Sequence, residues 1–123
     1  MTVEQAGFWP LQVIRGRDLV ISFYVDVNIE SWAGKAQIRE TASPTSDLLA
    51  EFAVDIGDYR LQTGNDDVGF MATPITLTLT KTQTAPITVD TGYWDMVLTD
   101  SSGVIDSYVV GPVSISDYPT VVT

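Results

Sequence analysis

Three features of the sequence predict an all-β protein built as an antiparallel β-sandwich. Residues 74–80, Pro-Ile-Thr-Leu-Thr-Leu-Thr, alternate strictly between apolar and polar side chains, the two-residue period of a half-buried strand. Four or five further segments repeat this pattern at short intervals, and turn residues separate them. No segment keeps a 3.6-residue period. The sequence therefore predicts seven to nine short strands in an immunoglobulin-like β-sandwich.

The length of 123 residues indicates one domain with a single core. Sixteen acidic and six basic residues give a formal charge of -10. This charge repels phosphate backbones and anionic lipid headgroups, so we expect neither a nucleic-acid partner nor a membrane partner. The acidity is interpreted as a solubilising surface, with a specific cationic partner as the alternative.

Cysteine and histidine are both absent. The chain therefore has no thiol nucleophile, disulfide, imidazole base, or zinc ligand of the sulfur or imidazole type. We expect a protein that is not an enzyme and that uses no cofactor. The N-terminus lacks the basic and apolar regions of a signal peptide, and no stretch approaches the ~18 apolar residues needed to span a bilayer.

The first half of the chain is expected to begin with an N-terminal arm, residues 1–9. Pro10 suits the start of an edge strand that runs to Gly16, because proline cannot donate to a ladder. The next strand, residues 19–27, has the clearest apolar stripe of the chain. A third strand over 35–39 is followed by a loop that the turn chemistry of Ser43-Pro44-Thr45-Ser46 predicts. Alternation then predicts a strand over 48–56, with a helix over 47–53 as the alternative.

The second half is expected to begin with its most irregular region, residues 57–73, which is predicted to contain a short strand around 59–62 and an acidic turn. After the strand at 75–80, a connection over 81–90 leads to a strand at 92–99 with Trp94 on its apolar face. Asp100-Ser-Ser-Gly103 predicts a tight hairpin turn into the next strand, 104–110. Gly111-Pro112 permits a bend or bulge in the final strand. The sandwich domain is thus expected over residues 10–116, with a C-terminal tail at 117–123.

Several polar clusters invite a chemical interpretation. Asp58, Asp66 and Asp67 offer oxygen ligands for calcium, but their spacing does not match an EF-hand, and we expect no metal site. Glu30, Glu40, Glu51 and Asp95 supply possible acid pairs for glycoside chemistry, yet nothing singles out a pair. Asp95 is expected to pair with Arg39 or Arg15 across a sheet. Arg15 and Arg17 are expected to form local ion pairs with Asp18 or its neighbours.

Surface contacts are the remaining candidates for function. The large apolar groups of the arm and of one turn are the expected partner contacts: Phe8, Trp9, Pro10 and Trp32. Aromatic residues also suggest a sugar-binding surface, although aromatics in strands more often pack in the core; the candidates are Trp9, Trp32, Tyr59, Phe70, Tyr93 and Tyr108. The threonine-rich strand at 76–80 suggests an exposed edge that another chain joins by β-augmentation.

The order of these segments resembles a small immunoglobulin-like domain of tailed-phage baseplate and tail proteins, found at the N-terminus of upper baseplate proteins. The resemblance covers residues 10–116 and departs from the family pattern at Gly16-Arg17 and over 57–73. The matching segments are Val13–Leu19, Ala33–Arg39, Leu49–Phe52, Ile75–Thr80, Gly92–Asp100, Gly103 and Gly111–Ile115.

That family carries no catalytic residues. The resemblance therefore implies a structural protein of the virion, assembled in the host cytoplasm as a tail or baseplate connector or as a fibre-attachment protein. We expect its partners to be other virion structural proteins, in a homo-oligomer or a multi-copy assembly. The alternatives are a capsid decoration or cement protein, a carbohydrate-binding module and, further off, a hydrolase that uses two acids.

Overall fold

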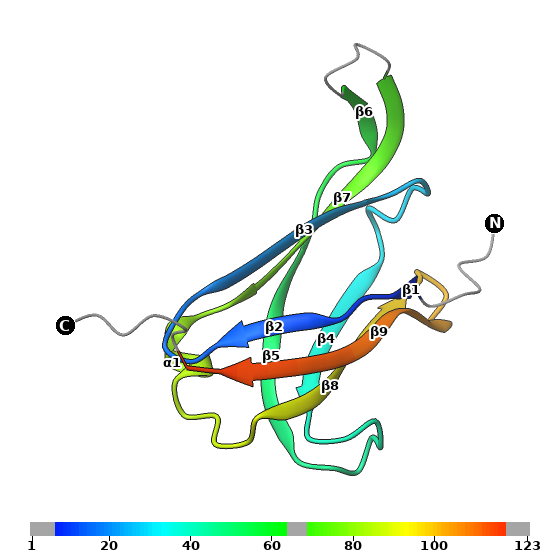
Figure 1. Ribbon diagram of the computed structural model, residues 1–123. Helices are drawn as coiled ribbons and strands as arrows, with labels where there is room; N and C mark the ends of the chain where they lie inside the picture. Colours follow the sequence, from blue (N-terminus) through cyan, green and yellow to red (C-terminus); the bar gives the residue numbers. More distant parts are fainter. Residues whose placement is uncertain (1–6, 64–68, 118–123) are drawn as a thin grey trace.

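The computed structural model describes residues 7–63 and 69–117 (Figure 1). Within these ranges the chain forms nine strands and one short helix. In chain order the elements are β1 (Gly7–Phe8), β2 (Leu11–Ile14), β3 (Leu19–Val25), β4 (Ala33–Arg39), β5 (Leu48–Ile56), β6 (Arg60–Thr63), β7 (Gly69–Leu79), α1 (Lys81–Thr84), β8 (Thr91–Thr99) and β9 (Ile105–Ser116).

The strands form two layers that β5 connects. In the large sheet, β9 pairs with β8, β8 with β4, and β4 with the first half of β5, all antiparallel. β1 and β2 both run parallel to β9 and complete this sheet. In the small sheet, the second half of β5 pairs with β7, and β7 pairs with β3. The hairpin of β6 and β7 extends beyond both layers (Figure 1).

This connectivity is that of an immunoglobulin-like sandwich, in which strands C, F and G form one sheet and B, E and D form the other. Here β4, β8 and β9 occupy the C, F and G positions, and β3, β7 and the second half of β5 occupy B, E and D. The predicted all-β, immunoglobulin-like fold is therefore confirmed. The two N-terminal strands, β1 and β2, pair with β9 rather than with β3.

The core lies between the two sheets and comes from the alternating apolar positions. On β3, Ile21 and Val25 are buried, and Leu19 and Phe23 pack against the core from its margin. On β8, Trp94 is buried, and its ring lies 5.8 Å from that of Phe52 on β5. The other fully buried aliphatic side chains of β4, β7 and β8 include Ile38, Ile75, Leu77, Leu79, Met96 and Leu98.

In the middle of the chain, the structure excludes one alternative and corrects one prediction. Residues 48–56 form a strand, so the alternative helix is wrong; pairing with both sheets decides between them. In the region 57–73, β6 confirms the expected short strand around 59–62, and the region is more regular than expected because β7 begins at Gly69 and pairs with β6. Pro74 lies where β7 changes partner, between Ile75 facing β5 and Ala72 facing β6.

The threonine-rich strand is not an edge. Thr76 and Thr78 on β7 face β3 on one side and β5 on the other, so both sides of the strand are paired. Alternation identifies the two faces of a strand but says nothing about its place in the sheet, which is why the expected edge is wrong. Within the described chain, β3 lies at the end of the small sheet and pairs with β7 alone.

The bend expected at Gly111-Pro112 is also absent, since β9 continues through these residues. The irregularity of β9 lies further back along the strand, where two steps from Val109 to Ser107 match the single step from Met96 to Val97 on β8. Gly111 has a different role: a Cβ at this position would collide with the backbone oxygen of Trp9. That oxygen also accepts a hydrogen bond of 2.8 Å from the indole nitrogen of Trp94. Gly111 therefore permits the close approach that joins the first strand to the core.

Arg15 holds together the end of the sandwich where α1 lies. Its guanidinium donates to the carbonyl oxygens of Ile87 and Val89, each at 2.7 Å. It also forms ion pairs with Asp90 at 2.8 Å and with Asp117 at 3.3 Å. The hydrogen bond to Asp90 is the largest of the influences that raise the pKa of Arg15. The expected local pairing of Arg15 is thus wrong, because its partners lie far away in sequence.

Asp18 stabilises the short helix that the sequence did not predict. Its carboxylate accepts a 2.7 Å hydrogen bond from the backbone N–H of Lys81, the first residue of α1. At the same end, the side-chain oxygen of Gln83 accepts a hydrogen bond from the N–H of Thr80. Backbone N–H groups at a helix start lack partners within the helix, so these contacts satisfy them.

Candidate functional site

The outward side of the large sheet carries one continuous row of side chains across five strands. Phe8 on β1 pairs with Val110 on β9, and Val110 pairs with Asp95 on β8. Asp95 pairs with Gln37 on β4, which pairs with Glu51 on β5. Residues in register across neighbouring strands share a face. An aromatic ring, an aliphatic group, a carboxylate and an amide therefore stand side by side.

A second row lies next to the first on the same side. Pro112 on β9 pairs with Tyr93 on β8, and Tyr93 pairs with Arg39 on β4, which pairs with Leu48 on β5. We call the surface formed by the two rows, together with the flanking side chains Lys35 and Val97, the outer face; it comprises Phe8, Lys35, Gln37, Arg39, Leu48, Glu51, Tyr93, Asp95, Val97, Val110 and Pro112.

The two ends of the outer face are apolar and exposed. Phe8 has 72% of its surface accessible at one end, and Leu48 has 47% at the other. Tyr93, Val97 and Val110 between them are half-buried. The outer face therefore combines apolar contact area at its ends with polar side chains at its centre.

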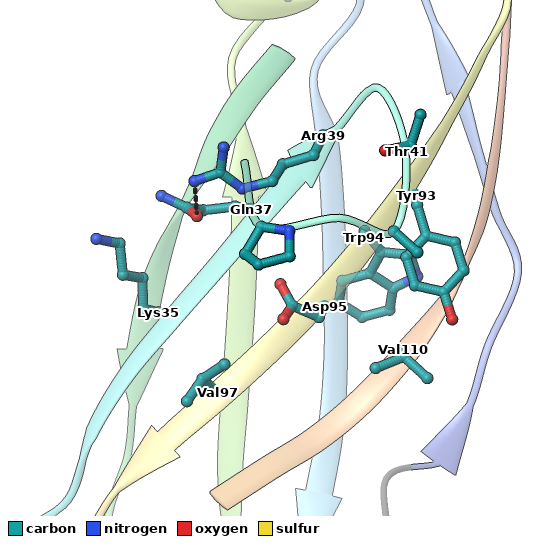
Figure 2. A pocket seen from close by; sticks show the side chains of 11 residues that line it. Lys35, Gln37, Arg39, Thr41, Tyr93, Trp94, Asp95, Val97 and Val110 are labelled. Atoms are coloured by element: carbon teal, nitrogen blue, oxygen red, sulfur yellow. Dashed lines mark hydrogen bonds between the residues drawn. The ribbon is translucent and has the colours of Figure 1, made fainter. Parts of the chain in front are cut away.

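The middle of the outer face is hollowed into a pocket of about 450 Å³. Strand β4 supplies Lys35, Gln37 and Arg39 to its lining, and β8 and β9 supply the opposite wall (Figure 2). The loop between β4 and β5 contributes Thr41, Ala42 and Pro44. The pocket is therefore bounded by three strands and one loop.

Hydrogen bonds hold that loop in place. The hydroxyl of Ser46 donates to the carbonyl oxygen of Ser43 at 2.8 Å and lies 3.1 Å from that of Thr41. The N–H of Glu40 donates to the carbonyl oxygen of Asp47 and closes the base of the loop at 2.9 Å. The predicted loop at 41–47 is confirmed, and its role as a wall of the pocket comes from the structure.

Arg39 is occupied by its neighbours. Its guanidinium donates to the carbonyl oxygen of Ser46 at 2.8 Å and to the side-chain oxygen of Gln37 at 3.1 Å. Gln37 in turn donates to the carboxylate of Glu51 at 3.2 Å. The Arg39–Gln37 bond is drawn in Figure 2. These three side chains form a chain of contacts that fixes the β4 side of the pocket.

Asp95 is the one acidic side chain among the lining residues of the pocket. Among the described residues, no hydrogen bond or ion pair joins its carboxylate to another side chain, so the expected pairing with Arg39 or Arg15 is wrong. The reason is that Arg39 donates instead to Ser46 and Gln37. Burial raises the pKa of Asp95, and the charge of Arg39 opposes this effect only in part.

The four expected contact residues lie in different surroundings. Phe8, Trp9 and Pro10 are exposed at the edge of the large sheet. The N–H of Trp9 donates to Val110, and its ring lies 6.1 Å from that of Phe23. Trp32 is half-buried and packs against the core. Since β1 and Trp9 belong to the sheet, the last three residues of the expected arm contribute to the fold, and whether any of the four contacts a partner stays a prediction.

The other candidate groups are not assembled into a site within the described residues. Asp58 is exposed, whereas Asp66 and Asp67 lie outside the described ranges. No group of three or more potential metal ligands occurs in the part of the chain that the structure covers. Glu30 accepts a hydrogen bond from the N–H of Tyr59, and it does not lie in the pocket of Asp95. Within residues 7–63 and 69–117, no helix has the length and apolarity required to span a bilayer.

The aromatic residues considered for sugar binding do not gather on one surface. Phe70 on the projecting hairpin makes an edge contact with Tyr24 of the small sheet, with ring centroids 5.7 Å apart. Tyr93 lies on the outer face of the large sheet, and Trp9 packs on Phe23. The side chain of Tyr108 lies outside the described part. The sequence missed Lys35, Gln37 and Val110 as pocket residues, because their only signal is their position on the polar side of alternating strands.

No family model matches the chain, and no curated protein does. Among solved structures, it is similar to a chicken TCR, with 13% identity and a TM-score of 0.49 over 95% of this chain and 56% of that chain. It is also similar to the NK cell receptor NKp44, with 16% identity and a TM-score of 0.47 over 92% of this chain and 100% of that one.

A third similar structure is the extracellular domain of the voltage-gated sodium channel beta4 subunit, with 13% identity and a TM-score of 0.40. That match covers 95% of this chain and 98% of the other. Likenesses of this degree say nothing about function, and the fold assignment rests on the strand connectivity.

Proposed function

We propose that this chain is a non-enzymatic structural domain of a tailed-phage virion that binds neighbouring subunits through its outer face. The observation that carries the contact role is the outer face itself, with exposed Phe8 and Leu48 at its ends and a pocket between them. The phage assignment is supported by the sequence resemblance over residues 10–116.

The groups on the outer face fit recognition better than catalysis. The sequence contains no histidine or cysteine, and the pocket offers one carboxylate, Asp95, beside an arginine that its neighbours already hold. Paired acids, as in glycoside hydrolysis, are not found in this pocket. Apolar ends and a polar centre instead provide contact area together with specificity.

Many copies in one assembly make modest contacts sufficient. When a subunit binds at two or more places, each later contact forms at high effective concentration, so weak individual interfaces hold firmly together. The formal charge of -10 favours neighbours with basic surfaces over further acidic ones. The proposed role therefore needs no large single interface.

The test compares incorporation of variants into purified tailed-phage particles, measured by quantitative mass spectrometry. The double change Phe8→Ser and Leu48→Ser removes both apolar ends of the outer face. Val20→Ser is the matched control, because Val20 on β3 is 60% exposed and lies on the small sheet. We expect the double variant to lose at least about tenfold in incorporation, equivalent to 1.4 kcal/mol, and the control to incorporate normally.

Two results would contradict the proposal. If purified particles lack the unmodified chain, the virion role is wrong. If the double variant, shown by circular dichroism to be folded, incorporates as well as the unmodified chain, the outer face is not the binding surface. Equal losses in the double variant and in the Val20 control would likewise remove the assignment to this face.

A further inference from the structure

The pocket of the outer face has one property that the docking role does not explain. Asp95 holds a half-buried carboxylate at its centre, and no described side chain forms a hydrogen bond or ion pair with it, although the charge of Arg39 acts on it without direct contact. A carboxylate that is partly removed from water and lacks a partner is costly, unless a ligand supplies the missing charge. In Figure 2 the Asp95 carboxylate lies in the middle of the pocket, between β4 and Val110.

The two cations near Asp95 do not fill this role. Arg39 donates to Ser46 and Gln37. Lys35 lies opposite Val97, two residues beyond Asp95 on β8. Neither forms an ion pair with Asp95. The oxygens of Asp95 thus have no donor among the described side chains, and a donor from outside can reach them through the pocket.

The walls of the pocket indicate which cation fits. Tyr93 and Val97 precede and follow Asp95 on the same side of β8, and Val110 faces it from β9. An arginine side chain has an apolar stem, a planar group that stacks on aromatic rings, and a fork that binds a carboxylate through two hydrogen bonds. A lysine offers the charge without the planar fork.

We propose that the pocket around Asp95 receives an arginine side chain from a partner protein, with the guanidinium on the carboxylate and its plane against Tyr93. This rests on the proposed docking role of the outer face. The partner is inferred to be a different chain, because two copies that each carry a charge of -10 repel one another. A cavity of about 450 Å³ is large enough for one such side chain.

The experiment follows backbone amide NMR shifts of the full chain during titration with three short peptides, acetyl-Gly-Arg-Gly-amide and its lysine and citrulline counterparts. Citrulline has nearly the shape of arginine but no charge. We expect the arginine peptide to shift the amides of residues 35–39 and 93–97 in a saturable manner. The citrulline peptide should produce no saturable shifts, and the lysine peptide should bind more weakly.

Two variants of the protein complete the test. Asp95→Asn should weaken the arginine peptide at least about tenfold, whereas Asp55→Asn, an exposed acid at the register position of Thr76 in the small sheet, should not change its binding. Binding that survives Asp95→Asn, or that falls equally with Asp55→Asn, overturns the proposal. A lysine peptide that binds as tightly as the arginine peptide overturns the choice of arginine.

The peptide titration and the particle experiment can fail independently of one another. If the arginine peptide binds at Asp95 but outer-face variants still enter particles normally, the pocket assignment stands and the docking role fails. If the peptide does not bind but the Phe8 and Leu48 changes prevent incorporation, the docking role stands and the arginine pocket fails.

Discussion

The side chains on the two sides of β8 differ in how deeply they are buried and in whether their polar groups have partners within the protein. On the inward side, Trp94 and Met96 are buried, and the indole nitrogen of Trp94 has its hydrogen-bond acceptor. On the outward side, Tyr93 and Val97 are half-buried, and Asp95 between them has no partner in the described chain. The inward side of β8 thus contributes buried side chains to the core, whereas its outward side presents a carboxylate without a hydrogen-bond or ion-pair partner among the described residues. We expect the fold not to depend on the outward side, which would leave that side available for the proposed binding.

Trp94→Ala should have the largest effect on the inward side. It removes a fully buried aromatic ring, its contact with Phe52 and its hydrogen bond to Trp9. We expect a loss of about 3–5 kcal/mol in the free energy of unfolding, measured by urea denaturation. Trp94→Phe is the matched control, because it keeps an aromatic ring in the core and removes only the larger indole and its hydrogen bond to Trp9. We expect it to lose less stability than Trp94→Ala. Equal losses would mean that the hydrogen bond, rather than burial, dominates.

Gly111→Ala should have the next largest effect. The added methyl group would collide with the backbone oxygen of Trp9 and so displace the acceptor of Trp94. We expect a loss of about 1–3 kcal/mol in the same denaturation experiment. Ser114→Ala, an exposed position on the same strand, is the control and should change the value by less than about 0.5 kcal/mol. A Gly111 variant as stable as this control would contradict the close approach.

The inward side is the part of the molecule that the sequence predicts well. Alternation alone places Ile21, Ile38 and Trp94 on the core side of their strands, because a two-residue period sorts apolar from polar side chains. It does not say which strands are neighbours. For this reason alternation wrongly predicts an edge at the threonine-rich β7, which pairs on both sides.

The site depends on information that alternation does not contain. The pocket exists because β4, β8 and β9 lie side by side and because the loop at 41–47 is held by Ser46. Asp95 has no ion pair with Arg39 because the guanidinium of Arg39 donates to Ser46 in that loop and to Gln37 instead. Pairwise spacing in the sequence cannot show such competition between acceptors for one donor.

Asp95→Asn should have a small effect on stability, and the size of that effect depends on pH. Burial raises the pKa of Asp95 above the usual 3.8, although Lys35 and Arg39 lie on the neighbouring strand. The relevant pH window lies between the usual pKa of 3.8 and the raised pKa of Asp95 in the folded state. Within this window the folded state binds more protons than the unfolded state, so the stability of the unmodified protein falls as the pH rises. Asparagine carries no such charge.

The variant should therefore match the unmodified protein below the window and be slightly more stable above it. Urea denaturation at pH 3 and pH 7 measures the difference, with Asp55→Asn as the exposed control. A variant that is less stable at pH 7 would mean that the Asp95 carboxylate contributes to the fold and is not reserved for a ligand.

We expect the sandwich to fold without the side chains of the outer face. The most direct measurement is the free energy of unfolding of a triple variant, Phe8→Ser, Leu48→Ser and Asp95→Asn, at pH 7. All three side chains lie on the outer face, so we expect the variant to keep its β-type circular dichroism spectrum and to unfold within about 1 kcal/mol of the unmodified protein. A loss comparable to that of Trp94→Ala would contradict this expectation, because the outer face would then be part of what holds the sandwich together.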